Sequence, residues 1–157
     1  MSDKPVYMTS EAYEQLKQEL DTLQHVTRVE VAARIAQAKE LGDLSENAEY
    51  HAARNEQSFV VGRIREIEHI LHRAELIPPE GANSNDVVRI GSTVTLREED
   101  GEEVTYRIVG SVEANPREGK ISNESPIGAA LLGKKVRDKV TVQTPSGSWT
   151  SKIVKIA

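Results

Sequence analysis

Residues 42–54 read GDLSENAEYHAAR, and this stretch separates two long segments that both have helical periodicity. Between Thr9 and Leu41 the chain contains no Pro and no Gly, and its apolar residues recur every three or four positions. The same spacing resumes after the stretch, and such spacing places apolar residues on one face of a helix. The sequence therefore predicts two long helices joined by a short connection, which is an antiparallel helical hairpin.

The two predicted helices each carry an apolar seam. The first seam consists of Tyr13, Leu16, Leu20, Leu23, Val31, Ile35 and Ala38. The second is expected to contain Ala48, Ala52, Phe59, Val60, Ile64, Ile67, Leu71 and Ala74. The step from Leu23 to Val31 is eight residues instead of seven, so the first seam drifts by about one position there. A slightly irregular coiled coil is the expected result, with helices on the order of 45 Å long.

Helical periodicity ends at residues 78–85, PPEGANSN. Paired prolines end a helix, and the residues after them favour turns. From residue 86 onward the apolar period becomes two, which is typical of strands, and Asp100-Gly101 suits a hairpin turn between two of them. A short helix is expected in SPIGAALLGK, where Ser125 suits the cap and Pro126 the first helical position.

These patterns predict an α+β protein made of two domains. An antiparallel coiled-coil hairpin is expected over residues 1–78, with its tip at about residues 41–47. A linker over residues 79–85 then leads to an antiparallel β-sheet domain with one short helix over residues 86–157.

Composition narrows the classes of function. The chain has no cysteine, which excludes disulfides, zinc–thiolate sites and cysteine nucleophiles. Aromatic residues make up 4%, which argues against a deep aromatic ligand pocket. No run approaches the roughly 18 apolar residues that a membrane span needs, and the N-terminus shows no targeting segment. We therefore expect a soluble, cytoplasmic protein that does not bind membranes.

The net charge of −5 is unevenly distributed. Residues 1–78 hold 9 basic and 14 acidic side chains, whereas residues 79–157 hold 11 of each. Affinity for duplex DNA comes mainly from Lys and Arg neutralising phosphates. An acidic protein is therefore not expected to bind duplex DNA through a broad basic surface.

Four side chains near the predicted tip could bind a metal: Asp43, Glu46, Glu49 and His51. Asp43 and Glu46 are three residues apart at the expected start of the second helix, so both carboxylates should face one side of its first turn. One or two carboxylates with other ligands suit Mg²⁺. The same Asp-x-x-Glu spacing is also a capping box, and spacing alone leaves both interpretations open.

Lys39 and Arg54 are expected on either side of the tip carboxylates. Beside an acidic tip they could hold phosphate groups of a nucleic acid strand. The alternative is ordinary surface salt bridging, which contributes about 0–1 kcal/mol.

Three segments carry a resemblance to a known family: LGDLSENAEYHAARNEQ at residues 41–57, TYRIVG at residues 105–110 and ISNESPIGAALLGK at residues 121–134. Together with the order of hairpin, linker and sheet, they make the chain similar to bacterial transcript-cleavage factors of the Gre family, GreA branch. The resemblance implies a coiled-coil hairpin followed by an FKBP-like domain. It also implies a transcription elongation factor, not itself an enzyme, that stimulates RNA polymerase to cleave the 3′ part of backtracked nascent RNA and so rescues arrested complexes.

The resemblance also implies roles for particular residues. In that family the C-terminal domain docks at the rim of the polymerase secondary channel, here through Glu124, Ser125 and Pro126. The hairpin passes down the channel, where Asp43 and Glu46 would share a second Mg²⁺ with the polymerase. That ion is expected only in the polymerase complex, with none bound to the free protein. Lys39 and Arg54 would contact the nascent RNA 3′ end or channel groups. A monomer is expected.

Two alternative functions remain at this stage. One is a secondary-channel-binding inhibitor or regulator built on the same scaffold, which would not stimulate cleavage. The other is a prolyl isomerase, because the C-terminal domain is expected to be FKBP-like. Such an enzyme needs a pocket rich in aromatic residues, and residues 79–157 offer only Tyr106 and Trp149.

Overall fold

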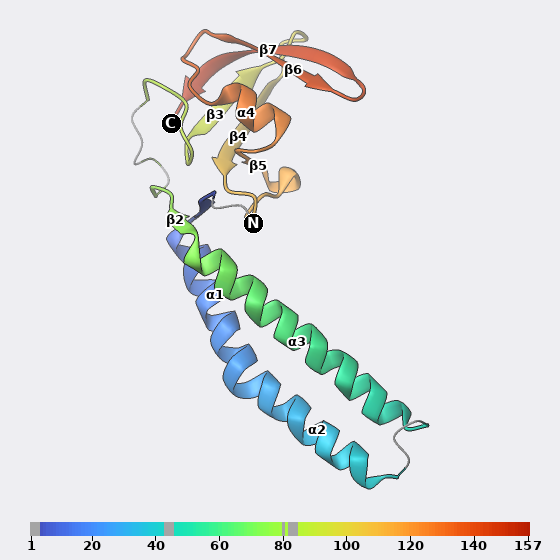
Figure 1. Cartoon of the computed structure of the whole chain (residues 1–157). Helices are drawn as coiled ribbons and strands as arrows, with labels where there is room; N and C mark the ends of the chain where they lie inside the picture. Colours follow the sequence, from blue (N-terminus) through green and yellow to red (C-terminus); the bar gives the residue numbers. More distant parts are fainter. Residues whose placement is uncertain (1–3, 43–45, 80, 82–84) are drawn as a thin grey trace. The chain divides into compact units, whose positions relative to one another are not determined.

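The computed structural model describes residues 4–42, 46–79, 81 and 85–157 (Figure 1). It confirms the α+β class, with a long helical hairpin followed by a β-sheet domain that carries one short helix. Contacts divide the chain into two compact units, a helical unit of Tyr13–Arg73 and a β unit. The predicted domain boundaries were drawn from sequence periodicity. In the structure, the β unit also includes the residues up to Ala12 and those from Ala74 onward.

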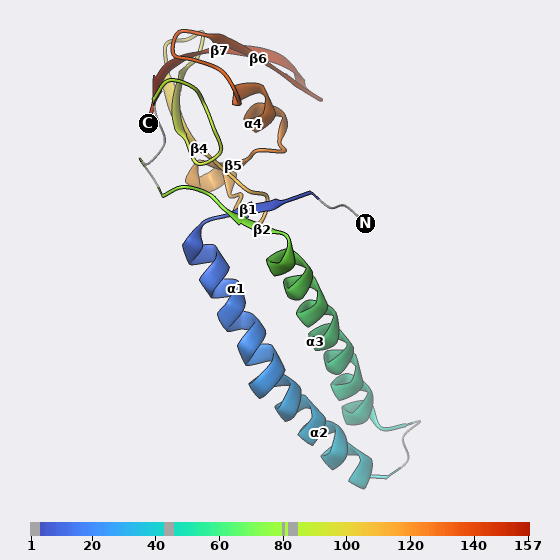
Figure 2. The same ribbon diagram turned by 60° about the vertical axis from the view of Figure 1, so that its left-hand side comes forward.

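The hairpin has two arms that run side by side in both views (Figures 1 and 2). The first arm consists of α1 (Ser10–Thr22), a π-helical turn η1 (Leu23–Thr27) and α2 (Arg28–Glu40), and the second is α3 (Ala48–His72). The π turn falls where the apolar spacing lengthens to eight residues. A π turn holds one more residue than an α turn, so it returns Val31 to the buried face. The predicted irregularity is confirmed.

The seam between the arms is narrow. Its buried side chains are Leu16, Val31, Ile35 and Ala38 from the first arm and Ala53, Val60, Ile64 and Ile67 from the second. The prediction for the start of the second seam is wrong. Ala48 and Ala52 are exposed, Ala53 is buried instead, and Phe59 is 73% exposed. Ala53 lies seven residues before Val60 and so belongs to the same helix face. Because Ala52 and Ala53 are adjacent and identical, apolar spacing alone does not show which of them is buried.

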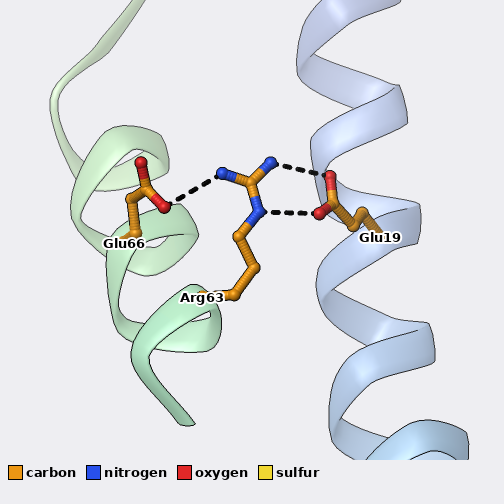
Figure 3. Close-up of polar contacts among 3 residues, drawn as sticks. All are labelled: Glu19, Arg63 and Glu66. Carbon is orange, nitrogen blue, oxygen red and sulfur yellow. Dashed lines mark hydrogen bonds and ion pairs between the residues drawn. The ribbon is translucent and has the colours of Figure 1, made fainter. Parts of the chain in front are cut away.

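Ion pairs flank this seam, and the best connected is centred on Arg63 (Figure 3). Its Nε and Nη2 donate to the two carboxylate oxygens of Glu19 on the other arm, at 2.7 and 3.0 Å. Its Nη1 donates to Glu66 at 3.1 Å. The hydrogen bonds from Arg63 hold the pKa of Glu19 below its usual value, although partial burial opposes this, and those to Glu19 raise the pKa of Arg63. The guanidinium thus links the two arms.

This pair makes hairpin stability depend on pH. Because the folded pKa of Glu19 lies below its unfolded value of about 4.5, its stabilisation is present above that pH and is lost as the pH falls through the folded pKa. We expect Glu19→Gln to lower the free energy of unfolding by about 1 kcal/mol at pH 7, since the pair is partly exposed. In urea unfolding, wild type and variant should converge as the pH falls below the folded pKa of Glu19, and Glu14→Gln should change little throughout. A difference that stayed constant as the pH fell would contradict this role.

The β unit contains a five-stranded sheet in the order β5-β4-β3-β7-β6. Its strands are β3 (Thr93–Arg97), β4 (Glu103–Val109), β5 (Lys120–Ser122), β6 (Lys139–Thr144) and β7 (Gly147–Ile156). The prediction of an antiparallel sheet holds for three of the four pairings, but β5 runs parallel to β4. Asn115 forms an antiparallel bridge to Lys120, so the chain has already turned back before β5 begins. An apolar period of two predicts a strand, but it does not show whether that strand runs parallel or antiparallel to its neighbour.

One face of this sheet is covered by the short helix α4 (Pro126–Leu131), which packs against β5 and β6 (Figure 1). The buried side chains of this inner face form one core: Val88, Val94, Leu96, Ile108, Ile121, Leu131, Val140, Val142, Ile153 and Ile156. Strand residues that alternate with these project from the opposite, outer face.

A second, two-stranded sheet was not predicted. β1 (Val6–Met8) pairs in parallel with β2 (Ala74–Leu76) (Figure 2). The backbone of Tyr7 lies against Gly110, where an added Cβ would come within 1.7 Å of the Tyr7 carbonyl oxygen. Next to it, Glu113 accepts hydrogen bonds from the backbone N–H and the hydroxyl of Thr9, at 2.7 and 2.6 Å. These contacts hold the first strand on the β unit.

We therefore expect Gly110→Ala to destabilise the fold strongly. Relieving the overlap requires a backbone shift, and overpacking of this kind costs about 1–3 kcal/mol or more. Urea unfolding measures the loss. Gly62→Ala is the matched control, because Gly62 lies in α3 with nothing within 4 Å of an added Cβ. It should stabilise the protein by about 0.5–1 kcal/mol. Equal effects of the two substitutions would contradict the tight packing at Gly110.

Candidate functional site

The tip of the hairpin begins where the first arm ends. Helix α2 closes at Leu41, whose backbone N–H donates to the Ala38 carbonyl at 3.1 Å. Gly42 follows with a φ of 121°, a backbone conformation that favours glycine. The first arm therefore ends at Leu41 and Gly42.

Asn47 starts the second arm and also ties it to the first. Its side-chain oxygen accepts from the Tyr50 backbone N–H at 3.0 Å, which makes it the N-cap of α3. Its side-chain nitrogen donates to the Ala38 carbonyl of α2 at 2.5 Å. One amide therefore caps one helix and bridges to the end of the other. Sequence reasoning missed this residue, although Asn is among the best N-caps and could have been found by that preference.

This cap corrects the predicted start of the second helix. Glu46 was expected in the first helical turn, either as a metal ligand or as part of a capping box. It lies instead one residue before the cap, in an exposed turn, and it makes no hydrogen bond or ion pair with the residues that the structure describes. The capping-box interpretation of Glu46 is therefore wrong. Asp43 lies outside the described residues.

Four other tip side chains lie on helix surfaces. Glu49 is exposed in the first turn of α3, where the helix dipole favours a negative charge. His51 is exposed with its ring edge against Tyr50, at 5.7 Å between centroids. Lys39 is exposed in the last turn of α2, and exposed Arg54 donates to Gln57 at 2.8 Å. Neither cation forms an ion pair with a described residue, which leaves both charges available.

The donor chemistry of the tip fits Mg²⁺. That ion takes one or two protein carboxylates and completes its shell with water or phosphate. The Glu46 carboxylate is exposed and unengaged within the described chain, so its oxygens are available as ligands. A separate acidic group, Glu98, Asp100 and Glu102, lies in the β3–β4 turn.

The segment at residues 124–126 forms the start of α4, as predicted. Ser125 is the N-cap, and its hydroxyl accepts from the Gly128 N–H at 3.1 Å and donates to the Ser122 carbonyl at 2.6 Å. Pro126 occupies the first turn, and both it and Glu124 are exposed. The structure thus presents a rigid, exposed corner.

Beside this corner lies a mainly apolar cavity of about 400 Å³. Its lining includes Pro126, Ile127, Tyr106, Val142 and Trp149. The cavity therefore joins the exposed start of α4 to the inner face of the sheet.

Two family models together match most of the chain. The family described as "Transcription elongation factor, N-terminal" matches residues 6–76, and "Transcription elongation factor, GreA/GreB, C-term" matches residues 83–157. Transcription elongation factor GreA of Chloroflexus aggregans is 57% identical over 157 residues, covering 99% of each chain. The chain belongs to the GreA/GreB family.

A second full-length relative agrees with this assignment. GreA of Bacillus subtilis is 51% identical over 159 residues and covers 100% of both chains. The crystal structure of GreA factor homolog 1 of Thermus thermophilus is 31% identical, with a TM-score of 0.43 over 98% of this chain and 99% of that one. The predicted membership of the GreA branch is confirmed by the full-length relatives. No helix in the described chain is both long and apolar enough to cross a bilayer.

The double role of Asn47 can be tested directly. Asn47→Ala removes the cap and the bridge, so we expect a loss of about 1–2 kcal/mol in the free energy of unfolding. Amide hydrogen exchange should also speed up at Tyr50, whose donor loses its acceptor. Asn55→Ala is the control, because Asn55 is exposed within the same helix. Unchanged exchange at Tyr50 in Asn47→Ala would rule out the cap.

Proposed function

We propose that this protein stimulates RNA polymerase to cleave the 3′ part of backtracked nascent RNA, and so returns arrested complexes to elongation. The observation that carries the proposal is the exposed carboxylate of Glu46, which has no partner among the described residues, on a hairpin tip where Asn47 bridges the two arms. Family membership supplies the context of transcription elongation. In this proposal the polymerase is the enzyme, and the tip would supply only part of a metal site.

The tip residues have a defined chemical task in this proposal. Hydrolysis of a phosphodiester with two metal ions needs one ion for the attacking water and another for the leaving oxygen. Asp43 and Glu46 would supply ligands to a weakly held second Mg²⁺ and orient the water. The polymerase would supply the remaining ligands, so the free protein is expected to bind Mg²⁺ weakly. The carboxylates thus complete a site instead of forming one.

The rest of the hairpin would carry the tip carboxylates to the polymerase active site. Helix α3 has 25 residues and is about 38 Å long, which suits reaching a buried active site through the secondary channel. Lys39 and Arg54, free of ion pairs with described residues, would hold RNA phosphates or channel groups near the tip. Glu124, Ser125 and Pro126 would dock on the channel rim, with one copy of the protein per polymerase. The rigid cap at Ser125 supports this role, since a docking surface benefits from preorganisation.

RNA cleavage in stalled, backtracked polymerase complexes tests the proposal. Adding the wild-type protein should accelerate cleavage, and Asp43→Asn with Glu46→Gln should remove most of the acceleration. We expect a loss of at least about tenfold, because each 1.4 kcal/mol of lost transition-state stabilisation is a factor of ten. Glu49→Gln is the matched control, an exposed acid three residues from Glu46 that should keep full activity.

The same assay separates docking from chemistry. Glu124→Gln should raise the protein concentration needed for half-maximal cleavage while the saturating rate stays the same. The tip substitutions should lower the saturating rate instead. If wild-type protein slowed elongation without accelerating cleavage, it would be a channel-binding inhibitor and the proposal would fail.

A further inference from the structure

Helix α3 has a second face that the first arm does not cover. Its members recur at steps of three and four residues, which places them on one side of the helix: Ala52, Asn55, Phe59, Gly62, Glu66 and His69. All six are exposed, whereas the seam residues Ala53, Val60 and Ile67 are buried. We call these six residues the outer stripe. Ala52 and Phe59, which apolar spacing wrongly assigned to the seam, both belong to it.

Two neighbours at the centre of the outer stripe are unusual for an exposed helix surface. Phe59 is 73% exposed, the largest fraction among the exposed large hydrophobic side chains that the structure describes. One turn further on, Gly62 has nothing within 4 Å of an added Cβ. Packing within the described chain therefore does not require glycine there, although glycine destabilises a helix interior relative to alanine. An exposed aromatic ring thus lies one turn from a hollow.

The ring and the hollow fit each other in two copies of the helix. A twofold interface is self-complementary, so that residue i contacts residue j of the partner and residue j contacts residue i. If two copies of α3 align antiparallel with Phe59 over Gly62 of the second copy, symmetry places the second Phe59 over the first Gly62. Each ring then fills a space that no side chain occupies, as a knob fills a hole in a coiled coil.

The same alignment brings compatible residues together along the rest of the outer stripe. Asn55 lies four residues before Phe59, and Glu66 lies four residues after Gly62. The two therefore face each other across the interface, where the Asn55 amide can donate to the Glu66 carboxylate. By the same count Ala52 faces His69. On the outer stripe, no like charges meet in this alignment.

Charges beside the outer stripe also favour the antiparallel direction. Glu56 and Arg63 flank it on the side of the first arm, with which both form ion pairs. Flanking residues on one side face each other in an antiparallel pair of helices, so each of these two approaches its opposite charge in the second copy. A parallel pairing in register would instead set Phe59 against Phe59 and Glu66 against Glu66, and the two carboxylates would repel.

We propose that the outer stripe is a self-association surface through which two copies of this protein form an antiparallel, twofold dimer. A second copy is the partner because the outer stripe supplies both the knob and the hole, with matching charges beside them. The contact involves one face of one helix, so the association should be weak and transient. The proposal goes beyond transcript cleavage and does not depend on it.

Sedimentation equilibrium of the full-length protein at concentrations up to about 500 µM tests this proposal, with an expected dissociation constant on the order of 100 µM. Phe59→Ser should weaken dimerisation at least about tenfold, because it removes the knob. Gly62→Leu should do the same by filling the hole, although leucine adds apolar surface and is a better helix former. Val29→Ser is the matched control, because Val29 is exposed on the first arm, outside the outer stripe.

Disulfide cross-linking tests the direction of the pairing, since the chain contains no natural cysteine. A mixture of the Asn55→Cys and Glu66→Cys proteins should form a linked pair much faster than either variant alone. In the antiparallel alignment, position 55 meets position 66 of the second copy. The two copies of position 55 would then lie about 16 Å apart along the helix axis, which is too far for a disulfide.

The results separate a specific dimer from general adhesion of apolar surface. Dimerisation that is lost in Phe59→Ser and in Gly62→Leu but kept in Val29→Ser, together with the mixed cross-link, supports the proposal. The proposal is overturned if the wild type stays monomeric throughout, or if Gly62→Leu dimerises more tightly than the wild type. It is also overturned if Asn55→Cys links to itself as fast as to Glu66→Cys.

Discussion

The narrow apolar seam between two helices is the constraint on which the rest of this structure depends. Each arm has a single helical neighbour along most of its length, so it buries one stripe and exposes the rest. Side chains as small as Ala38 and Ala53 fill the seam near the tip. Because apolar burial is limited there, polar links carry more of the task of holding the arms together. The Asn47 bridge to Ala38 is such a link near the tip, and the Arg63 pair with Glu19 joins the arms nearer their base.

At the tip, the backbone is held by hydrogen bonds while acidic side chains remain exposed. Asn47 and the end of α2 are tied by hydrogen bonds, whereas Glu46 has no partner among the described residues. A carboxylate already engaged in a capping box would have to give up that bond before binding a metal. Moving the cap to Asn47 releases Glu46 from this competition. The local structure therefore supports the proposed chemistry, in which the carboxylate must meet a metal held mostly by another protein.

Much of this fold follows from periodicity, and the failures have physical causes. Spacings of three and four predicted both arms, and the eight-residue step predicted an irregularity at the place where the structure has a π turn. The predicted seam is wrong at Ala52 and Ala53 because the two residues are equally small and apolar. It is wrong at Phe59 because a hydrophobic side chain need not be buried. Strands β1 and β2 are three residues each, too short for a period of two to register.

The candidate site likewise has residues that the sequence indicated and contacts that only the folded chain shows. Motif resemblance indicated Asp43, Glu46 and the α4 corner, but it carries no geometry. Asn47 could have been ranked as a cap from its residue type, whereas its bridge to Ala38 depends on two arms that meet only in the folded chain.

The π turn at Leu23–Thr27 shows how such a hairpin can tolerate a change in length. An extra residue in one arm would ordinarily rotate every later side chain by about 100° and bring the apolar stripe of α2 out of the seam. Here the additional residue is contained within one wide turn, and Val31, Ile35 and Ala38 return to the buried side. The arm therefore has a place where insertions can be absorbed between its base and its tip. Variation in the middle of the arm need not disturb the chemistry at its end.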